Sequence, residues 1–371
     1  MNIKRLGSAA TLALAGTLSL AACGSASNVE ASGTSGTPAG SASAAAGCGT
    51  GAVKASGSTA QQNAIEQAIA AYTSKCASAQ VTYNAVGSGQ GVTDFLGKQT
   101  SFAGSDSALK ADKGEPAAAK TACGSDAWNL PMVTGPIALA YNLDGVDKLV
   151  LTPQLVAKIF SGKITSWDDP AIAAVNKGVT LPKLAISVFF RADSSGTTDN
   201  FTKYMNTVDK ADWAAEHSKE WTGKVGQGKP KSAGVGQAVA STKGGITYVE
   251  WSYAITNKLA MAQLDSGSGP VALSAESAGA AIAAATQKGT GNDLALSIDY
   301  TTKAAGAYPI VLVTYEIVCS TYADKATAAN VKAFLTYMAS DAFQGTLNTV
   351  GSAPLPTEIK TKVQAAVAAI S

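Results

Sequence analysis

The sequence predicts an α/β protein with largely parallel sheets. Apolar strand-like runs alternate with segments of helical periodicity, and short turns rich in Gly, Ser and Thr join them. Small polar clusters repeatedly follow the strand-like runs. In an open α/β sheet the carboxyl ends of strands are where ligands bind, so these clusters are the candidate functional residues.

The first unit lies at residues 50–76 and combines a short strand, a Gly-Ser-Thr turn and a helix. Thr59 and Gln62 have capping-box spacing, which predicts that the helix begins there. The further elements follow the same reasoning. We expect strands in 80–86, 136–143 and 184–190, a strand pair in 308–319, helices in 152–162 and 326–340, and a strand leading into a helix in 244–255.

The N-terminus has the layout of a secretory signal. Lys4 and Arg5 precede an apolar stretch that ends in "LAAC" at Cys23. We expect residues 1–22 to be a signal peptide and residues 23–48 to be a lipid-anchor cysteine and a flexible linker, because Ala, Ser, Gly and Thr dominate there. "LAAC" resembles a bacterial lipobox, which implies lipidation of Cys23. A plain signal peptide cut near Ala22 is the alternative.

Charge argues against nucleic acid as a partner. The full chain carries 28 Lys and Arg against 26 Asp and Glu, and losing Lys4 and Arg5 with the signal leaves the two numbers equal. Binding to a phosphate backbone needs a dense basic surface, and no run of Lys and Arg is present. The folded stretch from about residue 49 is long enough for two domains.

The four remaining cysteines are Cys48, Cys76, Cys123 and Cys319, an even number that predicts two disulfides with three possible connectivities. We favour Cys48–Cys76, which would fasten the first strand to the end of the first helix, and Cys123–Cys319 within one domain. A zinc site is the weaker alternative, because no Cys-x-x-Cys pair exists and His217 is the only histidine.

Four polar clusters follow strand-like runs, at residues 57–59, 87–89, 104–107 and 191–198, and only the last carries a full positive charge, on Arg191. Each cluster taken singly also fits an ordinary turn. Together they would offer many neutral hydrogen-bond donors and helix N-termini to an anion.

Several enzyme classes lack their motifs. No Walker-type "GKS" or "GKT" and no G-x-S-x-G elbow is present, and we expect His217 to be a surface residue. Paired carboxylates of a glycoside hydrolase stay open on composition, but only 6% of residues are aromatic and no Trp-rich sugar platform appears. We therefore expect neither an enzyme nor a cofactor.

Six segments carry a family resemblance: "GST", "VGSGQGV", "FAGSDSAL", "GKITSWDDPAI", "FRADSSGTTDNFTKYM" and "GGITYVEWSYA". In order and spacing they resemble the phosphate-binding protein of Pst-type ABC transporters, over nearly all of residues 49–371. The resemblance implies a hinged, two-domain periplasmic-binding-protein fold of type II, with dehydrated phosphate held in the interdomain cleft. The domains would be 49–134 plus 309–371, and 135–308.

Carried over by position, the resemblance implies a phosphate-binding set: Thr59, the backbone of Ala60, Ser88, Asp106, Arg191, Ser195, Gly196 and Thr197. Asp193 would pair with Arg191 and fix its rotamer, although a simple turn role is the alternative. Some members have an aromatic residue where Ala60 stands, which leaves one wall of the cleft undefined.

Asp106 is the residue expected to select the anion. A carboxylate repels an anion unless the anion brings a proton that the carboxylate can accept, as monohydrogen phosphate does and sulfate does not. Partners implied are inorganic phosphate and a membrane ABC permease, for a monomer lipid-anchored outside the cell membrane. A binder of another oxyanion, a phosphate-ester hydrolase, and a structural or phosphate-sensing surface lipoprotein are the alternatives.

Overall fold

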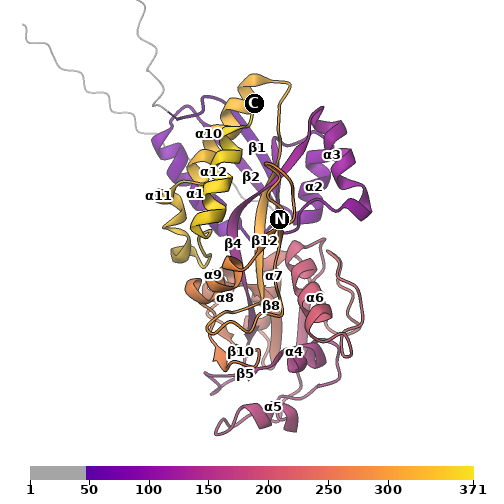
Figure 1. Ribbon diagram of the computed structural model, residues 1–371. Helices are drawn as coiled ribbons and strands as arrows, with labels where there is room; N and C mark the ends of the chain where they lie inside the picture. Colours follow the sequence, from indigo (N-terminus) through magenta and orange to yellow (C-terminus); the bar gives the residue numbers. More distant parts are fainter. Residues whose placement is uncertain (1–46) are drawn as a thin grey trace, which may run out of the picture. The chain divides into compact units, whose positions relative to one another are not determined.

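The computed structural model describes residues 47–371 (Figure 1). The predicted signal peptide, Cys23 and most of the predicted linker lie outside the described residues.

The main element is a nine-stranded mixed sheet with the order β2-β1-β3-β14-β4-β8-β6-β7, in which β9 also pairs with β4. Its strands are β1 (Ala52–Gly57), β2 (Gln80–Ala85), β3 (Phe102–Ser105), β4 (Ala127–Tyr141), β6 (Ser187–Arg191), β7 (Gln227–Lys229), β8 (Gly245–Glu250), β9 (Ala260–Met261) and β14 (Val311–Cys319). Smaller sheets join β5 (Val150–Leu151) with β10 (Gln263–Asp265) and β11 (Pro270–Val271), and β12 (Thr286–Gln287) with β13 (Leu296–Ser297).

The sheet is parallel only at its two sides. β1 is parallel to β2 and β3, and β6 is parallel to β7 and β8. The long central strands β4 and β14 pair antiparallel with each other and with their neighbours β8 and β3. The expectation of largely parallel sheets was therefore wrong at the centre, where every pairing of β4 and β14 is antiparallel.

Residues 308–319 do not form the predicted strand pair. They hold the single strand β14, which keeps pairing with β4 through a register shift between Thr314 and Tyr315. All nine residues of β14 are buried. A strand buried on both faces does not alternate between apolar and exposed polar residues, so its sequence pattern cannot locate a break.

Helices flank the sheet, and α1, α10 and α12 lie beside β1 and β2 in Figure 1. The α-helices are α1 (Gln62–Lys75), α2 (Ser88–Leu96), α3 (Glu115–Cys123), α4 (Pro153–Phe160), α5 (Pro170–Val175), α6 (Gly196–Val208), α7 (Lys231–Ala240), α8 (Trp251–Thr256), α9 (Ala275–Ala283), α10 (Lys325–Met338), α11 (Asp341–Gln344) and α12 (Thr357–Ala368). Two 3₁₀ turns, η1 (Ala111–Lys113) and η2 (Leu347–Val350), complete the set.

The predicted capping box of α1 does not form. Gln61 occupies the N-cap and makes no side-chain capping bond. The Thr59 hydroxyl instead shares a 2.7 Å hydrogen bond with Ser232 of α7. Residues 58–61 thus form a separate turn ahead of the helix, with Thr59 facing a distant segment of the chain.

Two main hydrophobic clusters pack against the sheet. The first core gathers β1, β3, α1 and α10, and the second gathers α4, α6 and β8. β4 passes from one to the other: Val133 lies in the first core and Ile137 in the second. Ala278 and Leu294, which the predicted boundaries place in the second domain, pack in the first core.

Two disulfides join Cys48 to Cys76 and Cys123 to Cys319, which is the favoured pairing. Both link segments packed around the first core, since all four cysteines belong to it or contact it. Within residues 47–371, none of the helices combines the length and the apolar content that crossing a bilayer requires.

Candidate functional site

The predicted anion-binding residues lie at the carboxyl ends of three strands of the main sheet and at the starts of two helices. Thr59 and Ala60 follow β1, Asp106 follows β3, and Arg191 ends β6. Ser88, Gly196 and Thr197 begin helices α2 and α6, and Ser195 caps α6. Every side chain in the set is buried, with exposed fractions of at most 4%. The strand ends therefore concentrate polar groups where solvent does not reach.

Arg191 is held on both sides of its guanidinium. Its Nε and Nη2 donate to the two carboxylate oxygens of Asp193 at 2.8 and 2.5 Å. Its Nη1 donates to Ser232 Oγ at 3.0 Å and to Thr197 Oγ1 at 3.3 Å. The predicted Asp193–Arg191 pair is thus present, and it fixes the plane of the guanidinium.

Asp106 accepts three hydroxyl hydrogen bonds. Ser58 and Thr314 donate to its Oδ1 at 2.5 and 2.7 Å, and Ser88 donates to its Oδ2 at 3.0 Å. The backbone N–H of Asp106 also donates to Ser88 Oγ at 3.1 Å. These hydrogen bonds fix the orientation of the carboxylate, which is only 3% exposed.

Because Gly196 has no side chain, the start of α6 can lie directly against Asp106. A Cβ atom at this position would lie 2.6 Å from both the Asp106 Cβ and the Ser88 Oγ. At Gly87 and Gly89, ahead of and within the first turn of α2, an added Cβ would overlap the side chains of Asp193 and Ser194, and Gly89 N donates to Ser194 O at 3.1 Å. Residues around the first core thus touch those around the second at the start of α6.

The start of α6 adds backbone donors to this place. Ser195 Oγ accepts from Thr198 N at 3.2 Å and so caps the helix. The N–H groups of Gly196 and Thr197 belong to the first turn, where they have no acceptor within the helix. Such N–H groups and the positive end of the helix dipole favour an anion.

Three residues of the site were missed from the sequence, and Ser58 was included in the 57–59 cluster without a role of its own. Ser58 and Thr314 hold Asp106, Ser232 links Arg191 to Thr59, and Glu250 accepts from the Thr197 hydroxyl. Glu250 stands at the end of β8, so the strand-end rule could have found it. Thr314 lies mid-strand and Ser232 starts a helix after a short edge strand, where the sequence gives no comparable signal.

Ala60 lies in the wall of the site. Its N–H donates to Ser58 Oγ at 2.9 Å, and its side chain packs in the second core. The wall of the site at this position is therefore a methyl group, which contacts residues of the second core.

Burial and charge shift the site's acid–base groups. Burial raises the pKa of Asp106 to about 6, against the hydrogen bonds from Ser58 and Thr314. Burial acts against the charge of Arg191, but Asp193 keeps the Arg191 pKa above its ordinary value. Burial also acts against ionised Asp193, and Arg191 nevertheless holds the Asp193 pKa below its ordinary value. The guanidinium is thus charged throughout the physiological range.

His217 is exposed, as predicted, and its Nδ1 lies 2.7 Å from Asp199 Oδ1. Among residues 47–371, no group of three or more His, Cys, Asp and Glu side chains is arranged to hold a metal ion. What the site does offer is one guanidinium, several hydroxyls, helix N–H groups and three hydrogen-bonded carboxylates. Asp193 pairs with the guanidinium, Glu250 accepts from Thr197, and Asp106 faces Gly196.

A mixed sheet carrying two cores, with polar strand ends from both meeting at one buried place, defines a substrate-binding protein of the periplasmic-binding-protein class. The family model described as the PBP superfamily domain matches residues 28–342.

Relatives narrow the class. Phosphate-binding protein PstS2 of Mycobacterium bovis is 46% identical, and PstS3 of the same species is 45% identical, each over 100% of both chains. Phosphate-binding protein PstS of Xylella fastidiosa is 32% identical over 77% of each chain. The chain belongs to the PstS family of phosphate-binding proteins.

Solved structures share the fold. A high-affinity periplasmic phosphate-binding protein, PfluDING, bound with phosphate has a TM-score of 0.69 at 23% identity, covering 84% of this chain and 93% of that one. The phosphate-binding protein of Stenotrophomonas maltophilia has a TM-score of 0.68 at 20% identity, covering 85% and 93%. At this identity the likeness supports the two-domain α/β fold.

Proposed function

We propose that the protein captures inorganic phosphate outside the cell membrane and delivers it to a membrane ABC permease. The observation that carries the proposal is the meeting of the Arg191 guanidinium, the α6 N-terminus and the Asp106 carboxylate at one buried place. A tetrahedral oxyanion needs donors on several sides, and this place provides them from both cores. The relatives PstS2 and PstS3 are phosphate-binding proteins by name, which agrees with a phosphate ligand.

Each residue of the predicted phosphate-binding set has a role in the proposal. Arg191 gives N–H bonds and charge, Thr59, Ser88, Ser195 and Thr197 contribute hydroxyls, and Ala60, Gly196 and Thr197 contribute backbone N–H groups. Charge-assisted bonds contribute about 1.5 to 3 kcal/mol each, and micromolar binding needs about 8 kcal/mol, so we expect submicromolar affinity after association costs.

Asp106 gives the proposal its selectivity. Ser58 and Thr314 occupy Oδ1, which leaves Oδ2, shared with Ser88, as the oxygen facing Gly196. Monohydrogen phosphate would donate its remaining proton to this oxygen. Sulfate has no proton to give and would place negative charge against negative charge.

Closure of two domains around the anion follows from where the ligands lie. Thr59, Ser88 and Asp106 belong to the proposed domain 49–134 plus 309–371, and Arg191 to Thr197 belong to the proposed domain 135–308. Phosphate would favour the closed form through contacts made only there. Neither disulfide crosses between the proposed domains, so both would leave the hinge free.

The anchor is a separate part of the proposal. We propose that Cys23 becomes lipid-modified after removal of residues 1–22, and that residues 23–48 tether a monomer to the outer face of the membrane. Replacing Cys23 with Ala should release the protein from the membrane fraction into the medium. Unchanged membrane attachment of C23A would contradict this part alone.

The test of the capture function is isothermal titration of the purified protein, stripped of bound anions, with inorganic phosphate. One-to-one binding with a submicromolar dissociation constant supports it. R191M should abolish the signal, whereas K177M, which removes an exposed positive charge elsewhere, should not. No phosphate binding by the wild type would overturn the proposal.

A further inference from the structure

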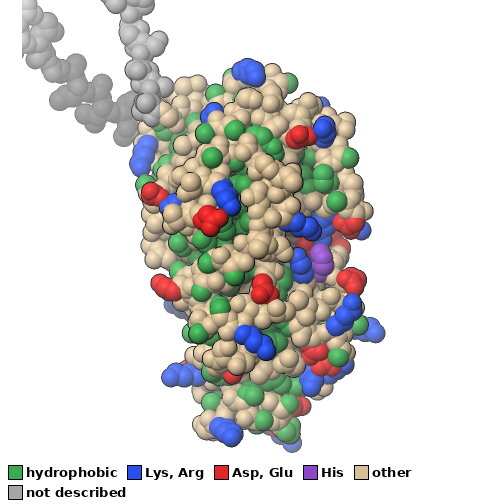
Figure 2. All heavy atoms as spheres, in the orientation of Figure 1, with side chains coloured by type: hydrophobic (Ala, Val, Ile, Leu, Met, Phe, Trp, Pro, Cys, Tyr) green, Lys and Arg blue, Asp and Glu red, His purple; other side chains and the backbone are tan. Residues whose placement is uncertain are grey.

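A large cavity lies next to the buried site formed by Arg191, Asp106 and the N-terminus of α6, which we call the inner site. Asp106 also belongs to the lining of this cavity. The cavity has a volume of about 1060 Å³, and its lining comes from residues 106–113, from α6 and the 216–222 loop, and from residues 288–300. Ligand pockets for small molecules span roughly 300 to 1,000 Å³, so the cavity is much larger than one phosphate needs. Figure 2 shows the region at the surface, where the histidine lies near one edge of the face with both basic and acidic side chains around it.

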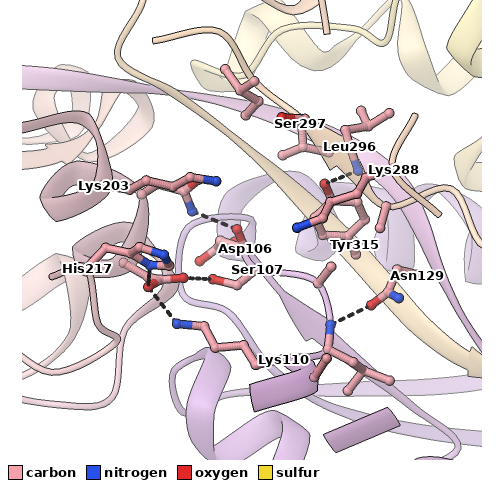
Figure 3. A pocket seen from close by; sticks show the side chains of 18 of the residues that line it. Asp106, Ser107, Lys110, Asn129, Lys203, His217, Lys288, Leu296, Ser297 and Tyr315 are labelled. Atoms are coloured by element: carbon pink, nitrogen blue, oxygen red, sulfur yellow. Dashed lines mark hydrogen bonds and ion pairs between the residues drawn. The ribbon is translucent and has the colours of Figure 1, made fainter. Parts of the chain in front are cut away.

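Two of the lysines that line this cavity, Lys203 and Lys288, have no ion-pair partner among the described residues, and the exposed Lys113 of η1 also lacks one. Lys203 stands on α6, two turns after Gly196, and Lys288 follows β12. Neither comes within 4.0 Å of a carboxylate oxygen in the described part of the chain. Figure 3 shows their ammonium ends reaching into the cavity from opposite sides.

The ammonium groups act on one another. Burial lowers the pKa of Lys203, Asp199 opposes this, and the positive charges of Lys288 and Lys110 lower it further. An anion placed between these groups would relieve their repulsion. The space between these lysines therefore favours an anion over a cation.

The carboxylates of the cavity are already engaged or lie at its edge. Asp199 accepts from Lys110 and Ser107 and lies beside His217. Asp293 accepts from both the backbone N and Nδ2 of Asn129, at 2.9 and 2.8 Å. Asp112 and Glu216 are exposed at the rim.

We propose that this cavity is an outer anion site, in which Lys203 and Lys288 hold hydrated inorganic phosphate before it enters the inner site. The inference rests on the proposed phosphate capture. It adds a second, weaker binding site for the same anion. Water would fill the part of the cavity that phosphate does not occupy.

A few hydrogen bonds between residues of the first and the second core separate the outer cavity from the inner site. Ser107 Oγ donates to Asp199 Oδ2 at 2.6 Å, and Asn200 Nδ2 donates to the Asp106 carbonyl at 2.7 Å. Both bonds join the segment after β3 to α6. When the proposed domains part, these bonds break, and the outer cavity becomes continuous with the inner site.

The experiment is stopped-flow measurement of phosphate association and dissociation for the wild type, K203M/K288M and the control K148M/K177M. The control removes two exposed lysines that do not line the cavity. Methionine keeps an unbranched apolar stem and removes the charge. We expect K203M/K288M to associate about three- to tenfold more slowly at low ionic strength, with an unchanged dissociation rate and a difference that vanishes in about 0.5 M salt.

Equal association rates in all three proteins would overturn the outer site. An equal slowing in the control would also overturn it, because it would indicate an effect of the overall charge of the protein. Faster dissociation in K203M/K288M would overturn it as well, because it would place the two lysines in contact with the bound anion. Failure of the capture function itself is distinct, because then none of the three proteins would bind phosphate.

Discussion

Gly196 lies against Asp106 so closely that no side chain fits between them: an added Cβ would stand 2.6 Å from the Asp106 Cβ and 2.7 Å from its Oδ2. Real Cβ atoms do not approach carbon or oxygen to these distances. The first residue of α6 must therefore be glycine if the selecting carboxylate and the anion-binding helix start are to meet.

The first prediction concerns this contact. G196A should raise the phosphate dissociation constant about ten- to hundredfold, because relieving the overlap costs about 1 to 3 kcal/mol of closed-state stability. G279A is the matched control, since a Cβ there meets no atom within 4 Å. Isothermal titration of both variants checks it, and equal affinities for G196A and the wild type would show that closure does not need this contact.

The second prediction concerns the pair of Asp193 with Arg191. Arg191 is 2% exposed, so D193N leaves a buried charge with a weaker partner, and the anion-free protein should lose several degrees of Tm. Phosphate would then compensate the guanidinium, so the phosphate-induced rise in Tm should be larger in D193N than in the wild type. Thermal unfolding with and without phosphate measures both.

D144N is the control for that experiment. The Asp144 carboxylate contacts Lys243, but the two side chains are 80% and 59% exposed, so its loss should change Tm little. A D193N protein with the Tm and phosphate response of D144N would contradict the account of the pair.

The third prediction concerns Glu316, which is fully buried on β14 and has no hydrogen-bond partner for either carboxylate oxygen among the described residues. Burial raises its pKa to about 8. The folded state then binds the proton more tightly than the unfolded state, so stability falls as pH rises from about 4.5 through about 8.

E316Q is neutral at every pH and escapes this loss. Its Tm should exceed that of the wild type by several degrees at pH 9 and match it near pH 5, in the absence of phosphate. E358Q, at an exposed position on α12, should show no such pH-dependent difference. A constant offset between E316Q and the wild type across this range would mean that Glu316 does not titrate there.

The fourth prediction tests a residue that sequence reasoning missed. Ser232 Oγ accepts from Arg191 Nη1 at 3.0 Å and shares a 2.7 Å bond with Thr59 Oγ1. S232A should weaken phosphate binding about tenfold, because a hydrogen bond to a charged group contributes about 1.5 kcal/mol or more. S241A, at the exposed end of the same helix, is the control, and equal titration curves for both variants would assign Ser232 a structural role only.

Much of the architecture could be predicted because it is local. Strand-end polar clusters, the amphipathic periodicity of α10 and the even cysteine count all lie in short windows of sequence, and the structure agrees with each. The same rule located the turns that carry Thr59, Ser88, Asp106 and Arg191.

What could not be predicted depends on contacts across the chain. The Thr59 capping box failed because a hydroxyl 173 residues away competes for the same side chain. The antiparallel pairing of β4 with β14, and Thr314 as a partner of Asp106, need the sheet order, which no local pattern specifies.

The most direct test of the central claim is titration of the anion-stripped wild type and D106N with phosphate and with sulfate. We predict tight phosphate binding and no sulfate response for the wild type. In D106N the asparagine amide can donate to an oxygen that carries no proton, so the preference for phosphate over sulfate should shrink by at least about 100-fold. A wild type that binds both anions equally, or a D106N protein with undiminished preference, would contradict selection by the Asp106 carboxylate.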